Sequence, residues 1–103
     1  MTSPTRIRAT VREGITEVRV LMQHEMENGR RKDEAGNLIP AWYITEIKAL
    51  HNDKIVLEGR FGTAVSKNPY LVFRFRGGVA GDKITLSWLD NQGESRSDEV
   101  EIG

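Results

Sequence analysis

An alternation of apolar and polar side chains is the feature that most constrains the fold of this chain, and it is clearest over residues 70–76. One parity of this segment holds Leu71, Phe73 and Phe75, whereas the other ends in two arginines. Successive side chains of a β-strand point to opposite faces of its sheet, so a period of two predicts a strand with one buried face. Such strands have to bury their apolar faces against one another, which favours a layered β-fold.

Further segments of the chain alternate in the same way and are separated by turn-forming residues. The predicted strands span residues 7–12, 16–22, 42–50, 54–61, 69–76, 83–90 and 94–102. Residues 42–50 also fit helical spacing, but we favour a strand with a bulge because no other segment is helical. About seven strands with turns at this spacing predict an all-β, antiparallel β-sandwich. The length of 103 residues indicates a single domain over residues 1–103.

The apolar parities of these strands are the expected core. They are Ile7, Ala9, Val11, Val18, Val20, Met22, Ile55, Leu57, Leu71, Phe73, Phe75, Ile84, Leu86, Trp88, Val100 and Ile102. Between the strands we expect a tight turn at residues 51–53 and hairpin turns at residues 77–82 and 90–93. Segment 77–82 contains three glycines but lacks the Lys-Ser/Thr of a phosphate-binding loop, so a turn is the better interpretation.

Charge and cysteine content exclude several classes of function. The 15 basic and 15 acidic side chains give a net charge of zero, so nucleic acid or anionic lipid would need a local basic patch. The chain has no cysteine, which removes thiolate nucleophiles, disulfides and cysteine-ligated metals. No apolar run approaches the roughly 20 residues that span a bilayer. Residues 1–10 are polar and show no signal-peptide pattern.

The two histidines are the candidates for metal binding or acid–base chemistry. The segment that starts at His24 begins like a zinc-protease HExxH motif, but Asn28 stands where the second histidine is needed, so this hypothesis fails. Met22, His24 and Met26 would share one face of a strand and could hold copper(I), although core packing is the commoner role of methionine. His51 lies in a predicted turn, where we expect a solvated imidazole. Without a nucleophile motif, the sequence indicates no catalytic residue, metal or cofactor.

Residues 23–37 have almost no periodic apolar content, so we expect a long solvent-facing loop that contributes little to the core. Its basic cluster, Arg30-Arg31-Lys32, is followed at once by Asp33 and Glu34, which weakens any hypothesis of phosphate binding. Loops on a rigid sandwich often carry recognition residues. A docking loop and a plain solvated loop therefore both remain open.

Three stretches of the chain carry a family resemblance. They are Leu21-Met22-Gln23-His24-Glu25-Met26-Glu27-Asn28-Gly29-Arg30-Arg31-Lys32-Asp33, Gly36-Asn37-Leu38-Ile39-Pro40-Ala41 and Ser66-Lys67-Asn68-Pro69-Tyr70. Together they closely resemble the SoxZ family of thiosulfate-oxidation subunits, over nearly the whole chain. The resemblance implies an immunoglobulin-like β-sandwich that pairs with a second subunit, SoxY. A cysteine near the C-terminus of SoxY carries covalent sulfur intermediates, so the resemblance implies a non-catalytic scaffold role for this chain.

The resemblance also implies transient contacts with the Sox cytochrome, hydrolase and dehydrogenase, and a periplasmic location reached by co-export with a signal-bearing partner. We expect no nucleic acid or membrane partner. The predicted partner-binding residues are His24, Met26, Arg31, Lys32, Lys67, Asn68 and Tyr70.

Other outcomes remain open at the sequence level. Apolar residues occupy both parities of segment 70–73, so the isolated chain could associate with itself. A free-standing binding module would use the loop from His24 to Pro40 for a ligand. A small hydrolase would need His24 to be buried beside a Ser or Thr and a carboxylate.

Overall fold

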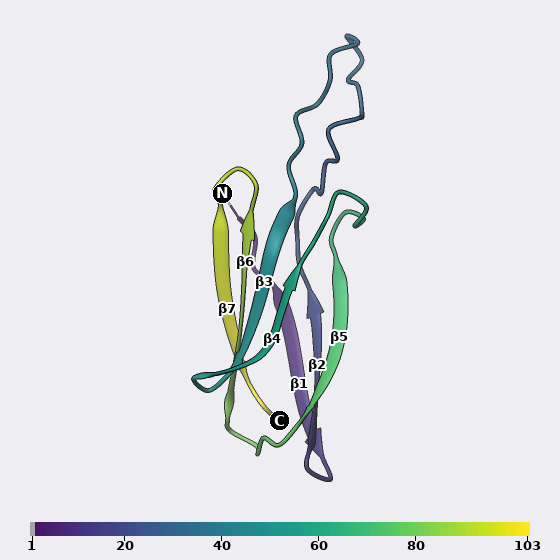
Figure 1. The fold of residues 1–103 in the computed structure, drawn as a ribbon. Helices are drawn as coiled ribbons and strands as arrows, with labels where there is room; N and C mark the ends of the chain where they lie inside the picture. Colours follow the sequence, from purple (N-terminus) through teal and green to yellow (C-terminus); the bar gives the residue numbers. More distant parts are fainter. Residues whose placement is uncertain (1) are drawn as a thin grey trace.

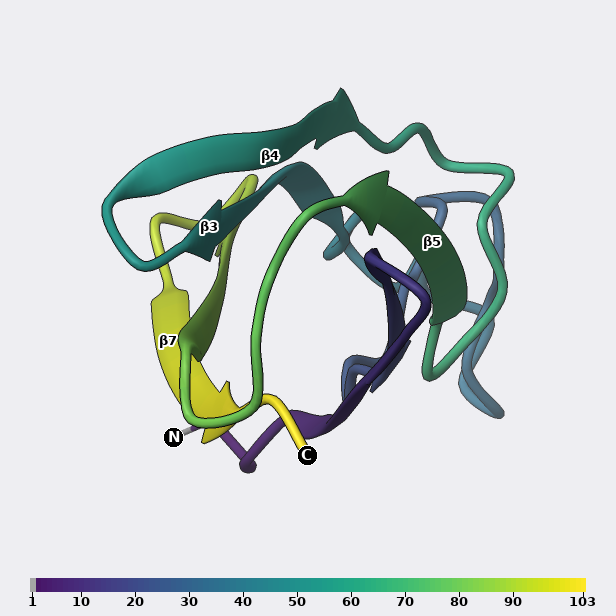
Figure 2. The same ribbon diagram turned by 90° about the horizontal axis from the view of Figure 1, so that it is seen from below.

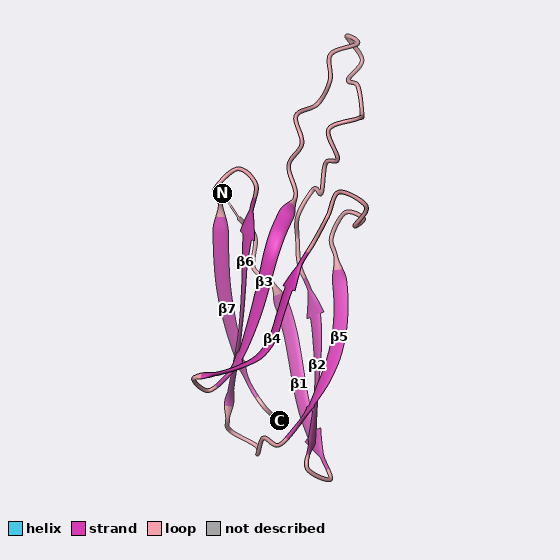
Figure 3. Ribbon diagram, in the orientation of Figure 1, coloured by secondary structure: helices cyan, strands magenta, loops and turns pink. Residues whose placement is uncertain are grey.

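The alternating segments form seven β-strands in the computed structural model, which describes residues 2–103 (Figure 1). The strands are β1 (Arg6–Arg12), β2 (Ile15–Leu21), β3 (Ile44–His51), β4 (Lys54–Arg60), β5 (Tyr70–Arg76), β6 (Lys83–Asp90) and β7 (Ser95–Glu101). The prediction of an all-β chain is confirmed, including the choice of a strand after Trp42 (Figure 3). In the part of the chain that the structure describes, no helix is long and apolar enough to cross a membrane.

The strands form two antiparallel sheets that face each other across the core, as the predicted immunoglobulin-like sandwich requires (Figure 2). One sheet has the order β1-β2-β5 and the other β4-β3-β6-β7. Residues 77–82 cross from β5 in the first sheet to β6 in the second, so the prediction of a hairpin turn there is wrong. The predicted turns between β3 and β4 and between β6 and β7 do join neighbouring strands.

The C-terminal residues close one side of the sandwich. The Gly103 N–H donates to the Ala9 carbonyl at 2.9 Å, and the Val11 N–H donates to the Gly103 carbonyl at 3.2 Å. Ile102, next to this contact, is buried at the end of β7. The chain end therefore ties β7 of one sheet to β1 of the other.

The predicted apolar parities supply most of the core. Val18, Val20 and Met22 come from β2 and its extension, and Ile84, Leu86 and Trp88 come from β6; all six are buried. Leu71, Phe73 and Phe75 of β5 pack against this core and are partly buried.

Two bulges alter the parity that simple alternation predicts. Against β6, the register of β3 shifts between Ile44 and Glu46, so that Ile44 and Ile47 are both buried. This agrees with the predicted bulged strand. A second shift, between β3 and β4, places Ile55 opposite Leu50 and leaves Ile55 47% exposed, so the prediction of Ile55 as a core residue is wrong.

We expect that no side chain fits at Gly78, because the segment between β5 and β6 passes close to the buried residue Thr16 there. Its φ is +89°, and a Cβ would overlap the hydroxyl of Thr16, which donates to the Gly77 carbonyl at 2.7 Å. We expect Gly78→Ala to lower the free energy of unfolding by about 2–4 kcal/mol, from left-handed strain and overpacking together. Gly81→Ala is the control, since Gly81 also has positive φ (+94°) but a Cβ there would meet no atom within 4 Å. Equal losses of the two variants in urea unfolding would contradict this assignment.

Candidate functional site

The segment between β2 and β3 extends beyond the sandwich as a narrow arm, residues 27–42 (Figure 1). Two antiparallel bridges hold its sides together, one between Glu27 and Trp42 and one between Lys32 and Leu38. At the tip, Asp33 Oδ1 accepts hydrogen bonds from the Ala35 and Asn37 N–H groups, each at 2.9 Å. The segment is exposed, as predicted, but it is an ordered extended hairpin because its backbone groups bond across the arm.

The base of the arm is anchored by a buried hydrogen-bond network centred on Asp90. One carboxylate oxygen of Asp90, Oδ2, lies 3.0 Å from His24 Nε2 and accepts from Trp42 Nε1 at 2.8 Å. The other oxygen, Oδ1, accepts from the N–H groups of Gln92 and Glu94, each at 2.9 Å. The network thus joins the end of β6 to Trp42 of the arm and to His24, which precedes the arm.

Hydrogen bonds make Asp90 a stable anion despite its burial. Burial by itself raises the pKa of this carboxyl, but the donors from His24, Trp42, Glu94 and Gln92 outweigh it and hold the pKa of Asp90 below its ordinary value. Asp90 therefore keeps its charge in the folded protein and acts as an acceptor for four donors.

The geometry leaves His24 no free nitrogen for acid–base chemistry. The Met26 N–H donates to His24 Nδ1 at 3.1 Å, which assigns the ring proton to Nε2, where it is donated to Asp90. The imidazole side chain is 1% exposed and packs against the rings of Trp42 and Trp88, with centroids at 4.9 and 5.2 Å. The carboxylate that a hydrolase needs is present, but among the described residues no Ser or Thr is bonded to this imidazole.

The sulfur-containing cluster around His24 belongs to the core. Met22 is fully buried and Met26 is 7% exposed. The Met26 sulfur accepts from the Ile44 N–H at 3.3 Å. Residues 2–103 contain no group of three or more His, Asp or Glu side chains that could hold a metal ion. The interpretation of Met22 and Met26 as core residues is therefore confirmed, and the prediction that this loop contributes little to the core is wrong at its base.

His51 is also more buried than expected and forms a hydrogen bond to Asp82. Its Nε2 lies 2.8 Å from Asp82 Oδ2, and its side chain is only 19% exposed beside the ring of Phe75. The prediction of a solvated imidazole is wrong, because β3 reaches one residue further than the predicted turn allowed. The hydrogen bond from His51 lowers the pKa of Asp82.

The predicted partner-binding residues fall into four places. His24 and Met26 lie under the base of the arm, Arg31 and Lys32 lie on its exposed part, and Lys67 and Asn68 lie beside its base. Tyr70 is separate from them, 61% exposed on the outer face of β5. Burial leaves His24 and Met26 almost no surface for a partner, and the binding role of the set stays a prediction.

Asn68 and Lys67 fix the loop between β4 and β5, residues 61–69, against the base of the arm. Asn68 has φ +53° and bonds twice with His24, from its own N–H to the His24 carbonyl at 2.9 Å and through Oδ1 to the His24 N–H at 3.1 Å. Lys67 Nζ lies 3.0 Å from Glu25 Oε2. A hollow of about 280 Å³ lies at this end of the sandwich, lined by Thr2, Ser3, Gln23, His24, Glu25, Trp42, Lys67, Asn68, Trp88 and Glu94.

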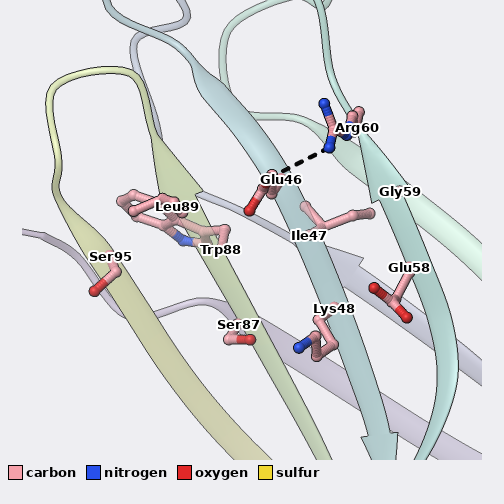
Figure 4. A pocket seen from close by; sticks show the side chains of 10 residues that line it. All are labelled: Glu46, Ile47, Lys48, Glu58, Gly59, Arg60, Ser87, Trp88, Leu89 and Ser95. Atoms are coloured by element: carbon pink, nitrogen blue, oxygen red, sulfur yellow. Dashed lines mark ion pairs between the residues drawn. The ribbon is translucent and has the colours of Figure 1, made fainter.

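A larger hollow, of about 490 Å³, lies on the outer face of the β4-β3-β6-β7 sheet (Figure 4). Its charged side chains are Glu46, Lys48, Glu58 and Arg60, with 4.0 Å between Arg60 Nη2 and Glu46 Oε1. The two acids and two bases on this open sheet surface balance one another in charge.

Sequence reasoning missed two members of the network, Trp42 and Asp90. A signal for Asp90 existed, because it shares the parity of Ile84, Leu86 and Trp88 and is therefore a carboxylate at an inward position. Its assignment to a turn hid that signal. Nothing local predicts its pairing with His24, which lies 66 residues away in the sequence.

Comparison with known proteins places the chain in a family. A family model described as sulphur oxidation protein SoxZ matches residues 5–101. No curated protein matches the chain. The matched span contains all seven strands, the arm and the buried network. The chain therefore belongs to the SoxZ family, and its role lies in sulfur oxidation.

Proposed function

We propose that this chain is the non-catalytic scaffold subunit of a sulfur-carrier heterodimer in the periplasm. Its partner is a SoxY-like subunit with a cysteine near its C-terminus, and that cysteine carries the covalent sulfur intermediates. The family match supports a place in sulfur oxidation. The absence of cysteine from this chain leaves the covalent step to the partner.

The arm is the observation that carries this proposal. It projects from the sandwich, buries little of its own surface between residues 28 and 40, and yet has an ordered backbone and a rigid base. A free-standing fold gains little from such a projection, whereas a docking element benefits from being ordered before it binds. The arm is therefore the surface that we assign to the partner subunit.

Arg31 and Lys32 test the arm as a docking element. Among the described residues, the Arg31 side chain bonds only to Glu27 of the arm itself, with Nε 3.1 Å from Oε1, and both basic side chains are exposed. We expect the double variant Arg31→Ala/Lys32→Ala to unfold at the same temperature as the unmodified chain. Its affinity for the purified SoxY-like subunit should fall at least about tenfold, mainly through slower association.

A matched control removes the same charge elsewhere. The variant Lys48→Ala/Lys54→Ala changes two exposed lysines, one in β3 and one in β4. It should bind the subunit as the unmodified chain does. Binding that is unaffected by the arm substitutions would exclude the arm as the docking element. An unmodified chain that does not bind the subunit at all would overturn the proposed function.

Mass spectrometry of the loaded complex tests the scaffold role separately. After incubation with the sulfur-transferring enzymes, adducts should appear on the partner's cysteine and not on this chain. His24→Ala should leave that loading intact wherever the complex still forms, because His24 has no nitrogen free to take part. Loss of loading in an assembled complex would show that His24 acts in the chemistry.

A further inference from the structure

The outer face of the β1-β2-β5 sheet is strongly basic, although the chain as a whole is neutral. Six arginines from its three strands point outward: Arg6, Arg8, Arg12, Arg19, Arg74 and Arg76. Glu17 is the acidic side chain among them, and Glu13 lies in the turn at one end. Six arginines against one glutamate on three short strands form a local patch that the net charge of zero conceals.

Internal pairing neutralises little of this patch. Arg19 and Arg74 share Glu17, each with a nitrogen 2.8 Å from one of its oxygens, and these bonds lower the pKa of Glu17. Within residues 2–103, the other four arginines have no acidic group within ion-pair distance. Their guanidinium groups are available to a partner.

The strand register places two like charges opposite each other, and this repulsion does not help to stabilise the fold. Arg8 stands directly opposite Arg19 in the β1–β2 ladder, and both side chains point outward. Like charges in directly opposite positions destabilise a sheet. Exposed residues that lower the stability of the fold are typical of a surface used for binding.

Apolar side chains lie among the arginines. Tyr70 is 61% exposed, Ile15 43% and Val72 41%. Across the sheet, the register places Tyr70 in one row with Leu21 and Arg6, and Val72 in one row with Arg19 and Arg8. Arginine and tyrosine interleaved with aliphatic groups form the composition that is enriched in protein–protein interfaces.

We propose that this arginine face, the outward side chains of β1, β2 and β5, docks an acidic surface of a visiting protein during sulfur transfer. Arginine forks bind carboxylates in a bidentate manner, and the apolar groups between them suit a protein surface better than a phosphate backbone. Three strands of seven residues cover roughly 24 by 14 Å. That area is below the roughly 800 Å² per partner of a stable complex, so the contact is transient.

A second copy of this chain is a poor occupant. The exposed charges of the other sheet are balanced, with four acids and four bases: Glu46, Glu58, Glu99, Glu101, Lys48, Lys54, Arg60 and Lys83. That sheet offers no acidic counterpart to the arginine face. The occupant is therefore a different protein, and this inference rests on the proposed function because the carrier must meet the enzymes that load and unload it.

Charge reversal tests the inference. The complex of this chain with its SoxY-like subunit would be mixed in a stopped-flow instrument with each probe in turn: the sulfur-oxidising cytochrome, hydrolase and dehydrogenase. We expect Arg8→Glu/Arg19→Glu to slow association with at least one probe about tenfold or more at low salt, and to flatten its salt dependence. Lys48→Glu/Lys54→Glu makes the same change of net charge on the other sheet and should alter the rate less than about twofold.

The outcomes separate the two proposals. If the subunit still binds the unmodified chain but the arginine variant associates with every probe at the unmodified rate, the arginine face has no docking role. The complex could instead bind a 20-base-pair DNA duplex at physiological salt. If the arginine variant loses only that binding, the face recognises nucleic acid and the inference is wrong. If the subunit does not bind the unmodified chain, the proposed function fails and this inference fails with it.

Discussion

Replacing Asp90 by alanine is expected to lower the free energy of unfolding by about 3–5 kcal/mol, because it removes a buried acceptor and leaves its four hydrogen-bond donors unpaired. The Asp90 side chain is fully buried and accepts hydrogen bonds from His24, Trp42, Gln92 and Glu94. None of these groups gains a protein partner in exchange. A small domain has only about 5–15 kcal/mol of stability in total, so the loss should be obvious in urea unfolding.

Asp82 provides a matched control for this prediction. It too is an aspartate bonded to a histidine, with His51 Nε2 at 2.8 Å, but its side chain is 24% exposed. Water can replace the carboxylate there, so Asp82→Ala should destabilise the fold far less than Asp90→Ala. Equal losses in the two variants would show that burial of the network contributes nothing.

The hydrogen-bond network around Asp90 should make the stability of the fold depend on pH. The pKa of Asp90 is lower in the folded protein than its ordinary value. A carboxyl of this kind stabilises the fold above its unfolded pKa of about 4, and the stabilisation is lost as the pH falls through the folded pKa. The pKa values of Asp82 and Asp98 are shifted the same way, so the whole chain should weaken in acid. Asp90→Asn should show a smaller loss than the unmodified chain between about pH 5 and pH 2, measured by urea unfolding at each pH.

Alternation predicted the strands and most of the core because burial on one face of a sheet imposes it directly. Val18, Val20, Leu86 and Trp88 are buried where the period of two places them. The period fails at Ile55, since a bulge adds one residue and reverses the parity beyond it. Bulges depend on the register with a neighbouring strand, which the sequence of one strand does not contain.

The site was harder to predict than the fold, because its contacts join distant parts of the chain. His24 was recognised as a candidate, but its burial depends on Asp90 and Trp42, which are distant in the sequence and meet it only in the folded chain. The arginine face was missed for a related reason. Its members alternate along three strands, so a search for consecutive basic residues finds Arg30-Arg31-Lys32 in the arm instead.

Leu86→Ala is expected to lower the free energy of unfolding by about 2–5 kcal/mol. Leu86 is fully buried in β6, a central strand, opposite Ala49 of β3 and Asp98 of β7. Alanine at position 49 is too small to expand into the space that a truncated Leu86 would leave, so the cavity should persist and add to the lost burial.

Leu89 in the same strand is the control, because it has the same side chain on the opposite parity and is 39% exposed. Leu89→Ala should cost about 1 kcal/mol or less, since more than a third of the residue already faces water and less apolar area is removed from the interior. Guanidinium unfolding of both variants, with unchanged slopes, would measure the difference. Similar losses would mean that β6 does not separate a buried face from an exposed one. Because Asp90 lies on the same inward parity as Leu86, that result would also remove the structural basis for the anchor of the arm.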